Sequence, residues 1–229
     1  MTPDRSLRRI AVPIAGAIVL VAGTLGVIGL ADAATESDGL AAFDPALTAN
    51  AVSRRTPALT AVARTLTFIG STPVLVILTL AAALLLWRWT SSLRGPAVLI
   101  LAMIGSSTLT YVLKTLVGRK RPDVTVVLGP VEDTFAFPSG HTLNTTVFFI
   151  TLAALVWGRL RSLRNKILIA VFAVTLSIGV GFSRVYLGYH WATDVLAGWT
   201  VALTWLSIVL SVAYLTAPSG DAAPPPDRP

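Results

Sequence analysis

Residues 68–87 read FIGSTPVLVILTLAAALLLW, and residues 95–117 read GPAVLILAMIGSSTLTYVLKTLV. Each stretch is long and apolar enough to cross a lipid bilayer as a helix, because about 20 residues span the hydrocarbon core. The whole chain of 229 residues is 54% hydrophobic and only 13% charged. An average soluble domain carries about 25% charged residues. The sequence therefore predicts an integral membrane protein.

Four further apolar stretches bring the predicted spans to six. Backbone polar groups in lipid must be satisfied within their own segment, so every span is expected to be a helix. We therefore predict an all-α, polytopic membrane protein with a six-transmembrane-helix bundle, which forms a single domain over residues 1–216. The predicted spans are Ile10–Ala31, Phe68–Trp87, Gly95–Val117, Thr142–Gly158, Ile167–Phe182 and Trp191–Leu215.

The longest link between spans contains an amphipathic pattern. Leu59, Val62 and Leu66 follow one another at three- and four-residue steps, which is typical of a helix with one apolar face. Arg55 and Arg64 are available to lipid headgroups. Such a helix either lies on the outer membrane surface, as an interfacial amphipathic helix, or caps the bundle.

The two ends of the chain differ in character. Arg5, Arg8 and Arg9 precede the first apolar run, which fits a signal peptide or an uncleaved signal anchor. The run is longer than an ordinary signal core, and this length favours the anchor. The tail, residues 217–229, is rich in Pro and small residues and is expected to be disordered.

The charges of the loops predict the orientation. Two short loops, residues 88–94 and 159–166, carry Arg and Lys but no acidic residue, whereas residues 32–44 carry four acidic residues. Basic loops stay in the cytoplasm. We therefore expect a multi-pass protein of the cell membrane whose N-terminus is cytoplasmic.

Composition excludes other functions. The net charge of +7 is assigned to cytoplasmic loops and to contacts with membrane lipids, because no basic patch with interleaved aromatic residues is present for nucleic acid. The chain has no cysteine, which excludes disulfides and metals held by Cys.

The first of three polar clusters is formed by Lys114 and Arg121, seven residues apart. On a helix that Pro122 ends, the two side chains would share one face. Ionisable residues at membrane depth are costly and are therefore candidates for function. Taken alone, this pair equally fits a basic segment that touches headgroups.

The second cluster is FPSGH, residues 137–141, directly before the fourth span. Ser139 is expected to cap the helix. The free N–H groups and the positive dipole end beside Gly140 suit a phosphate. Taken alone, the motif also fits an ordinary cap with His141 at the membrane interface.

The third cluster contains Ser183 and Arg184, followed by His190 and Asp194. His190 and Asp194 are four residues apart and would be neighbours on a helix. A carboxylate that accepts from one ring nitrogen makes the other nitrogen the reactive one. Taken alone, the pair also fits a structural link between two helices.

Together, the clusters place three cations, a helix N-terminus and two histidines on the outer side of the membrane. This set matches phosphoryl transfer, in which positioning and charge neutralisation dominate. The nearby acids are few and no His-rich cluster is present, so neither a metal site nor a cofactor is expected.

The motif set resembles that of the type 2 phosphatidic acid phosphatase family, membrane lipid phosphatases whose motifs are shared with soluble vanadium haloperoxidases. The family pattern is K-x6-R-P, P-S-G-H and S-R-x5-H-x3-D, and every position is present in this order. The resemblance implies that His190 is the nucleophile, that Asp194 orients it, and that His141 protonates the leaving oxygen. It also implies a phosphate site formed by Lys114, Arg121, Ser139, Gly140 and Arg184.

The expected function is hydrolysis of a lipid phosphomonoester or diphosphate through a phosphohistidine, without metal, on the extracytoplasmic side. Expected substrates are undecaprenyl or another polyprenyl diphosphate, phosphatidylglycerophosphate and phosphatidate. A lipid phosphotransferase of the same family, in which a hydroxyl replaces water, is an alternative. So is a membrane transporter, although transporters usually carry ionisable residues near the midplane within inverted repeats.

Overall fold

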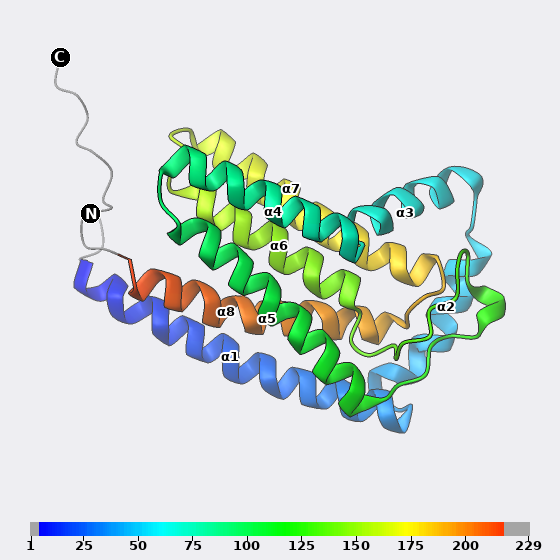
Figure 1. Ribbon diagram of the computed structural model, residues 1–229. Coiled ribbons are helices and arrows are strands. Elements are labelled where there is room, and N and C mark those ends of the chain that lie inside the picture. Colours follow the sequence, from blue (N-terminus) through cyan, green and yellow to red (C-terminus); the bar gives the residue numbers. More distant parts are fainter. Residues whose placement is uncertain (1–4, 218–229) are drawn as a thin grey trace, which may run out of the picture.

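The computed structural model of the chain describes residues 5–217, with side chains from residue 11 onward. In this part of the chain every regular element is helical, and six long helices run side by side as a bundle (Figure 1). All six are long and apolar enough to cross a membrane. The long helices are α1 (Arg5–Glu36), α4 (Thr72–Thr90), α5 (Arg94–Val117), α6 (Gly140–Trp157), α7 (Leu163–Tyr186) and α8 (Ala192–Leu215).

The predicted all-α bundle with six spans is confirmed, and its helix ends differ from the prediction by only a few residues. The expected disorder of residues 217–229 falls, except for the first residue, outside the described part of the chain. Short helical elements occupy the links between the long helices. They are η1 (Gly39–Phe43), α2 (Asp44–Ser53), α3 (Pro57–Ile69) and η2 (Val124–Val126).

The amphipathic segment forms α3. Thr56 caps this helix, because its Oγ1 accepts a hydrogen bond from the N–H of Leu59 at 3.2 Å. One face of α3 packs on α7, while Leu59, Val62 and Phe68 are exposed. The amphipathic helix is therefore confirmed. Its exposed apolar side chains favour a place at the membrane surface, and that location stays a prediction.

The helix α6 lies at the centre of the bundle and packs against α4, α5, α7 and α8. Leu143 and Val147 of α6 join residues of α5 and α8 in one core cluster. Phe148 joins residues of α4 and α5 in a second cluster. Because α6 begins with Gly140 and His141, this core packing also determines where the second motif lies.

Glycines let the helices approach one another closely. A β-carbon at Gly105 would lie 2.1 Å from the ring of Trp205, and one at Gly23 of α1 would lie 1.9 Å from Oγ1 of Thr204 on α8. Helices in lipid gain little from burying apolar side chains, so close backbone packing has to supply much of their attraction. The long contact of α1 with α8 is an example.

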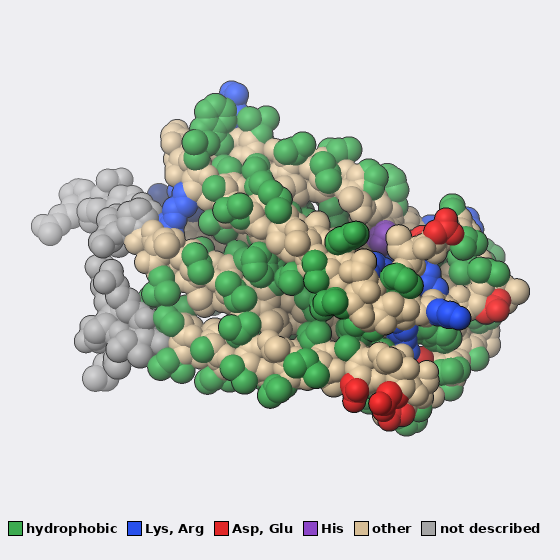
Figure 2. All heavy atoms as spheres, turned by 60° about the horizontal axis from the view of Figure 1, so that its bottom comes forward, with side chains coloured by type: hydrophobic (Ala, Val, Ile, Leu, Met, Phe, Trp, Pro, Cys, Tyr) green, Lys and Arg blue, Asp and Glu red, His purple; other side chains and the backbone are tan. Residues whose placement is uncertain are grey.

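Hydrophobic side chains cover the long sides of the bundle, and the charged side chains visible from this direction gather at its two ends (Figure 2). Ile18, Leu80, Ile104 and Leu203 are each more than half exposed in the isolated chain. Lipid covers such side chains in a helix of membrane-spanning length. The chain is therefore a multi-pass membrane protein.

All three motifs meet at the end of the bundle where α2 and α3 lie (Figure 1). The C-terminal end of α5, the N-terminal end of α6 and the turn between α7 and α8 come together there. Gly188 lies in this last turn with φ +81, a left-handed conformation that glycine adopts without steric cost. A β-carbon on Gly188 would also lie 2.3 Å from the carbonyl oxygen of Val126.

Gly188→Ala should therefore destabilise the fold by about 1–3 kcal/mol from backbone strain alone, and the clash adds to this cost. We expect a lower melting temperature of the detergent-purified protein, measured by intrinsic fluorescence. Gly158→Ala is the matched control, because φ there is −66 and a β-carbon would meet nothing within 4 Å. Equal melting temperatures for the two variants would contradict this account of the turn.

Candidate active site

Two arginines and a glutamate form the centre of the site. Arg121 Nη2 lies 2.7 Å from Glu132 Oε2, and Arg184 Nη2 donates to Oε1 of the same carboxylate. Arg184 is 2% exposed and is held in place: its Nη1 donates to Thr67 Oγ1 at 2.8 Å, and its guanidinium lies 4.1 Å from the ring centre of Tyr189. Two guanidiniums fixed side by side form an anion site.

His190 lies beside these arginines and is 1% exposed. Its Nε2 lies 3.3 Å from Arg121 Nη1. A guanidinium can only donate, so we assign Nε2 as the unprotonated nitrogen and Nδ1 as the one that carries the proton. Nδ1 faces Asp194 Oδ2 at 3.5 Å, slightly longer than a hydrogen bond. The reactive lone pair therefore points toward the arginine side.

Burial and nearby cations keep His190 neutral. Burial has the largest effect, followed by the positive charges of Arg184, Arg121 and Lys114. Together they lower the pKa of His190 well below its usual value, against the opposing charge of Glu132. A neutral imidazole keeps a lone pair on one of its ring nitrogens.

His190 and Asp194 do not share a helix, which corrects the expectation from their spacing. His190 lies in the turn before α8, and Asp194 lies in the first turn of that helix. Asp194 Oδ2 accepts from the N–H of Trp191 at 2.9 Å, as carboxylates often do at helix N-termini. The turn, and not helical spacing, brings the ring to the carboxylate.

A buried ion network holds Asp194. Arg119 Nη1 donates to Asp194 Oδ1 at 2.7 Å, and its Nη2 donates to Asp44 Oδ2 at 2.8 Å. Asp44 also accepts from the backbone N–H of Thr193 at 3.0 Å and from the hydroxyl of the same residue. The two aspartates are 1% exposed or less. Buried charges need such partners, and the network leaves Asp194 Oδ2 facing His190.

The prediction that Lys114 and Arg121 share one helical face is wrong. The helix α5 ends before Gly118, which adopts φ +64, the left-handed conformation common just past a helix end. Pro122 therefore does not end the helix. Lys114 lies in the last turn of α5 and donates to the carbonyl of Phe135, whereas Arg121 enters the site from the link that follows. The charges of the two residues still interact.

Ser139, Gly140 and His141 stand at the start of α6. Ser139 occupies the N-cap position, but its hydroxyl accepts from Thr142 Oγ1 at 2.9 Å and makes no capping bond, which corrects the expected cap. The first N–H groups of α6 are thus not capped by this side chain. The Ser139 N–H donates to the carbonyl of Asp194 at 3.0 Å, which ties α6 to α8. His141 lies within electrostatic reach of both arginines of the anion site.

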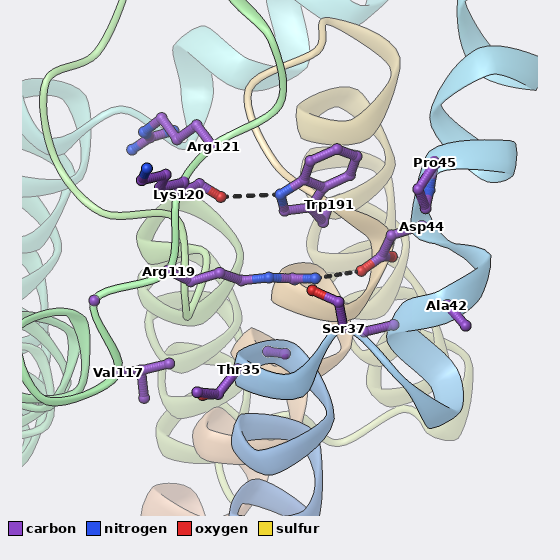
Figure 3. A pocket seen from close by; sticks show the side chains of 13 residues that line it. Thr35, Ser37, Ala42, Asp44, Pro45, Val117, Arg119, Lys120, Arg121 and Trp191 are labelled. Carbon is purple, nitrogen blue, oxygen red and sulfur yellow. Dashed lines mark hydrogen bonds and ion pairs between the residues drawn. The ribbon is translucent and has the colours of Figure 1, made fainter.

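A cavity of about 440 Å³ opens beside the ion network, between the end of α1, the start of α2 and the link after α5 (Figure 3). Arg119 extends across it to Asp44, and Trp191 forms part of its wall. The cavity is lined by Arg121 but by neither histidine. At the anion site itself, the side chain of Glu132 lies between the arginines.

Three charged residues of the site were not predicted. They are Asp44, Arg119 and Glu132, and each makes an ion pair within the site. Arg119 and Glu132 lie in links, and Asp44 begins a short helix. The apolar pattern of the spans does not predict the path of such segments. Only Arg119 carried a signal, because it lies within the stretch of the first motif.

The site joins two histidines, three predicted cations and a buried carboxylate at one end of a membrane bundle. In the described part of the chain, no group of three or more His, Asp or Glu residues is placed to hold a metal ion. Fold and site thus define a class: an integral membrane protein with an anion site beside a buried histidine.

Comparisons with known proteins agree with this class. Residues 95–216 match the sequence model of the PAP2 superfamily. The chain is 32% identical over 175 residues to phosphatidylglycerophosphatase B of Bacillus subtilis (strain 168), which covers 75% of this chain and 83% of that protein. It is 28% identical over 115 residues to an undecaprenyl-diphosphatase of Sulfolobus acidocaldarius, which covers 48% of this chain and 51% of that protein.

A solved structure is also similar. It is the first transmembrane PAP2 type phosphatidylglycerolphosphate phosphatase from Bacillus subtilis, with a TM-score of 0.80 and 29% identity, over 86% of this chain and 97% of that chain. The chain therefore belongs to the PAP2 superfamily, and it is a membrane-embedded lipid phosphatase of that family. The match begins in α5 and includes all three motifs.

Asp44→Asn should lower kcat and leave KM nearly unchanged. With Asp44 neutral, the full charge of Arg119 acts on Asp194 and weakens the interaction of Asp194 with His190. Couplings within one ion network are worth about 1–2 kcal/mol, which corresponds to a roughly tenfold lower kcat. Phosphate release at varied substrate concentration measures both constants.

Glu36→Gln is the matched control for this variant. The substitution also removes one negative charge, but from an exposed residue at the end of α1. An unchanged kcat in Asp44→Asn, or a rise in KM alone, would contradict the positioning role of the network.

Proposed function

We propose that the protein hydrolyses a lipid phosphomonoester or lipid diphosphate through a phosphohistidine on His190, without a metal ion. The position of the neutral His190 ring carries this proposal. Its unprotonated Nε2 lies 3.3 Å from Arg121, at the edge of a site with two guanidiniums. A nucleophile that the fold already holds beside two guanidiniums needs little reorganisation of its own to reach a bound phosphate.

The motif residues around the His190 ring would bind the phosphate group. Arg121 and Arg184 would each donate to the phosphate oxygens, and Lys114 would add a third positive charge. Ser139 and the backbone N–H of Gly140, at the start of α6, would add donors at the positive end of the helix dipole.

In the first chemical step, His190 Nε2 attacks the terminal phosphorus as the bond from that phosphorus to the leaving oxygen breaks. The leaving oxygen is the lipid oxygen in a monoester and the bridging oxygen in a diphosphate. The leaving oxygen takes a proton from His141, whose protonated form the negative charge of the bound phosphate favours. Asp194 stabilises the positive charge that develops on the His190 ring. In the second step, water attacks the phosphohistidine and gives a proton to His141. The N–P bond breaks, inorganic phosphate leaves, and His190 is neutral again.

Two observations support a lipid as the substrate. The site lies at the end of a bundle whose sides are covered by exposed apolar side chains, so a bound lipid tail can stay in the bilayer. The relatives are named for phosphatidylglycerophosphate and undecaprenyl diphosphate, and both resemble this chain in sequence. We infer that the substrate is one of these two lipids or phosphatidate.

The site is proposed to face the outside of the cell membrane. The links α4–α5 and α6–α7 lie at the bundle end opposite the site (Figure 1). Both links are basic and contain no acidic residue, which favours the cytoplasm for that end.

The detergent-purified protein should release inorganic phosphate from at least one of undecaprenyl diphosphate, phosphatidylglycerophosphate and phosphatidate, with EDTA present. His141→Ala should lose about 10²–10⁴-fold in rate, the range for general acid–base help. His190→Ala should lose more, and Asp194→Asn should fold normally but turn over poorly. Colorimetric phosphate assays and melting temperatures check these outcomes.

Samples quenched in alkaline detergent with radiolabelled substrate add a test of the intermediate, because the N–P bond of a phosphohistidine survives base but hydrolyses in acid. Label should stay on the wild-type protein and be absent from His190→Ala. Equal phosphate release by wild type and His190→Ala would falsify the mechanism.

The chain lacks cysteine, so single cysteines can report the orientation. Val124→Cys lies near the site end and Ser92→Cys in the α4–α5 link, and both positions are exposed. A membrane-impermeant maleimide should label only Val124→Cys in intact cells and both variants after permeabilisation. The reverse pattern would place the site in the cytoplasm.

A further inference from the structure

The anion site already contains an anion of the protein itself. Glu132 Oε2 pairs with Arg121, and Glu132 Oε1 accepts from Arg184. These are the two arginines that the proposed function assigns to the phosphate. A carboxylate that offers one oxygen to each of two guanidiniums occupies the positions that two phosphate oxygens would take.

Glu132 is ionised when it lies there. Burial opposes its charge, but Arg184 and Arg121 outweigh this effect and hold the pKa of Glu132 at about 2. The contact is therefore a charged one at neutral pH. Its side chain remains 32% exposed, whereas that of Arg184 is 2% exposed. In the pair formed by Arg184 and Glu132, the glutamate is therefore the residue that can reach solvent.

The chain around Glu132 is anchored on both sides but exposed in between. Before it, the N–H of Leu128 donates to the carbonyl of Leu187 at 2.9 Å. After it, Arg121 holds the carbonyl of Thr134 at 2.6 Å. In the segment 129–133 between these anchors, the other four residues are exposed and Glu132 alone is not. This short exposed segment between the two anchors is where the chain would move if the carboxylate left the site.

We propose that Glu132 is an internal competitor of the lipid phosphate: its carboxylate occupies the two-arginine site in the free enzyme, leaves when the substrate phosphate enters, and returns as inorganic phosphate departs. This inference rests on the proposed function for the identity of the natural ligand. The glutamate lowers the affinity for every phosphate by the same factor, since each must displace it.

Such a competitor has a use in turnover. Binding that is equally strong in the ground state and in the transition state lowers KM without raising kcat. A site with two arginines and a lysine holds inorganic phosphate as well as substrate, and slow product release limits many enzymes. A carboxylate that returns to the arginines offsets this excess affinity and shortens the time that the product stays bound.

A purely structural role for Glu132 predicts the opposite result. If the carboxylate served only to hold Arg121 and Arg184 in place, its removal would disorder them and weaken phosphate binding. The sign of the change in affinity therefore separates the two roles.

The test is calorimetric titration of inorganic phosphate into the full-length, detergent-purified protein at pH 8. Glu132→Gln should bind phosphate about 10- to 100-fold more tightly than wild type, the factor that one charge-assisted hydrogen bond typically carries. Asp133→Asn is the matched control, because it removes the same charge from the next, exposed position. Its affinity for phosphate should stay within about twofold of wild type, as expected for a screened surface charge.

Unchanged or weaker binding by Glu132→Gln would overturn the proposal, and so would an equal gain in Asp133→Asn. In hydrolysis assays, Glu132→Gln should show a lower KM and stronger inhibition by phosphate, by a common factor. The calorimetric comparison needs no turnover. If wild type hydrolysed no lipid, the proposed function would fail while the titrations still decided the role of Glu132.

Discussion

The structure of the site depends on Asp194, a buried carboxylate in the first turn of α8. Its backbone carbonyl accepts from Ser139 at the start of α6, and its side chain accepts from Arg119 in the link after α5. The same side chain faces His190. One residue thus joins all three motifs, which are far apart in the sequence. Asp194 is fully buried, so protein groups and not water must satisfy its polar atoms. These partners hold the three segments in one geometry.

Charge balance extends this constraint to the rest of the site. Arg119 is shared between Asp194 and Asp44, and Arg121 and Arg184 are shared by Glu132. Buried guanidiniums without acceptors would be costly at the end of an apolar bundle. The two pairings nevertheless differ in burial. The Asp44 and Asp194 side chains are 2% exposed or less, whereas that of Glu132 is 32% exposed. This difference in burial fits a lasting first pairing and the proposed exchange of the second.

The sequence predicted the spans well because apolar length is a strong, local signal, and α5 ends at the predicted residue Val117. Its motif pattern also named eight candidate site residues, and the segments that carry them meet at one end of the bundle. It failed wherever the backbone leaves regular helix. Gly118 ends α5 before Arg121, and the turn at Gly188 places His190 outside α8. Glu132 carried no signal, since long-range folding of a link, and not periodicity, brings it to the arginines.

In the proposed mechanism, the positive charge that suits phosphate also prepares His190 for attack. Arg121 donates toward Nε2 of His190, and as long as it does so no proton can occupy that nitrogen. A dianionic phosphate would otherwise favour protonation of the ring and remove the lone pair. If a phosphate takes the place of Glu132, as proposed, its oxygens would draw the Arg121 guanidinium and free the lone pair where phosphorus arrives. Phosphate binding and exposure of the His190 lone pair would then both follow from one movement of the Arg121 side chain.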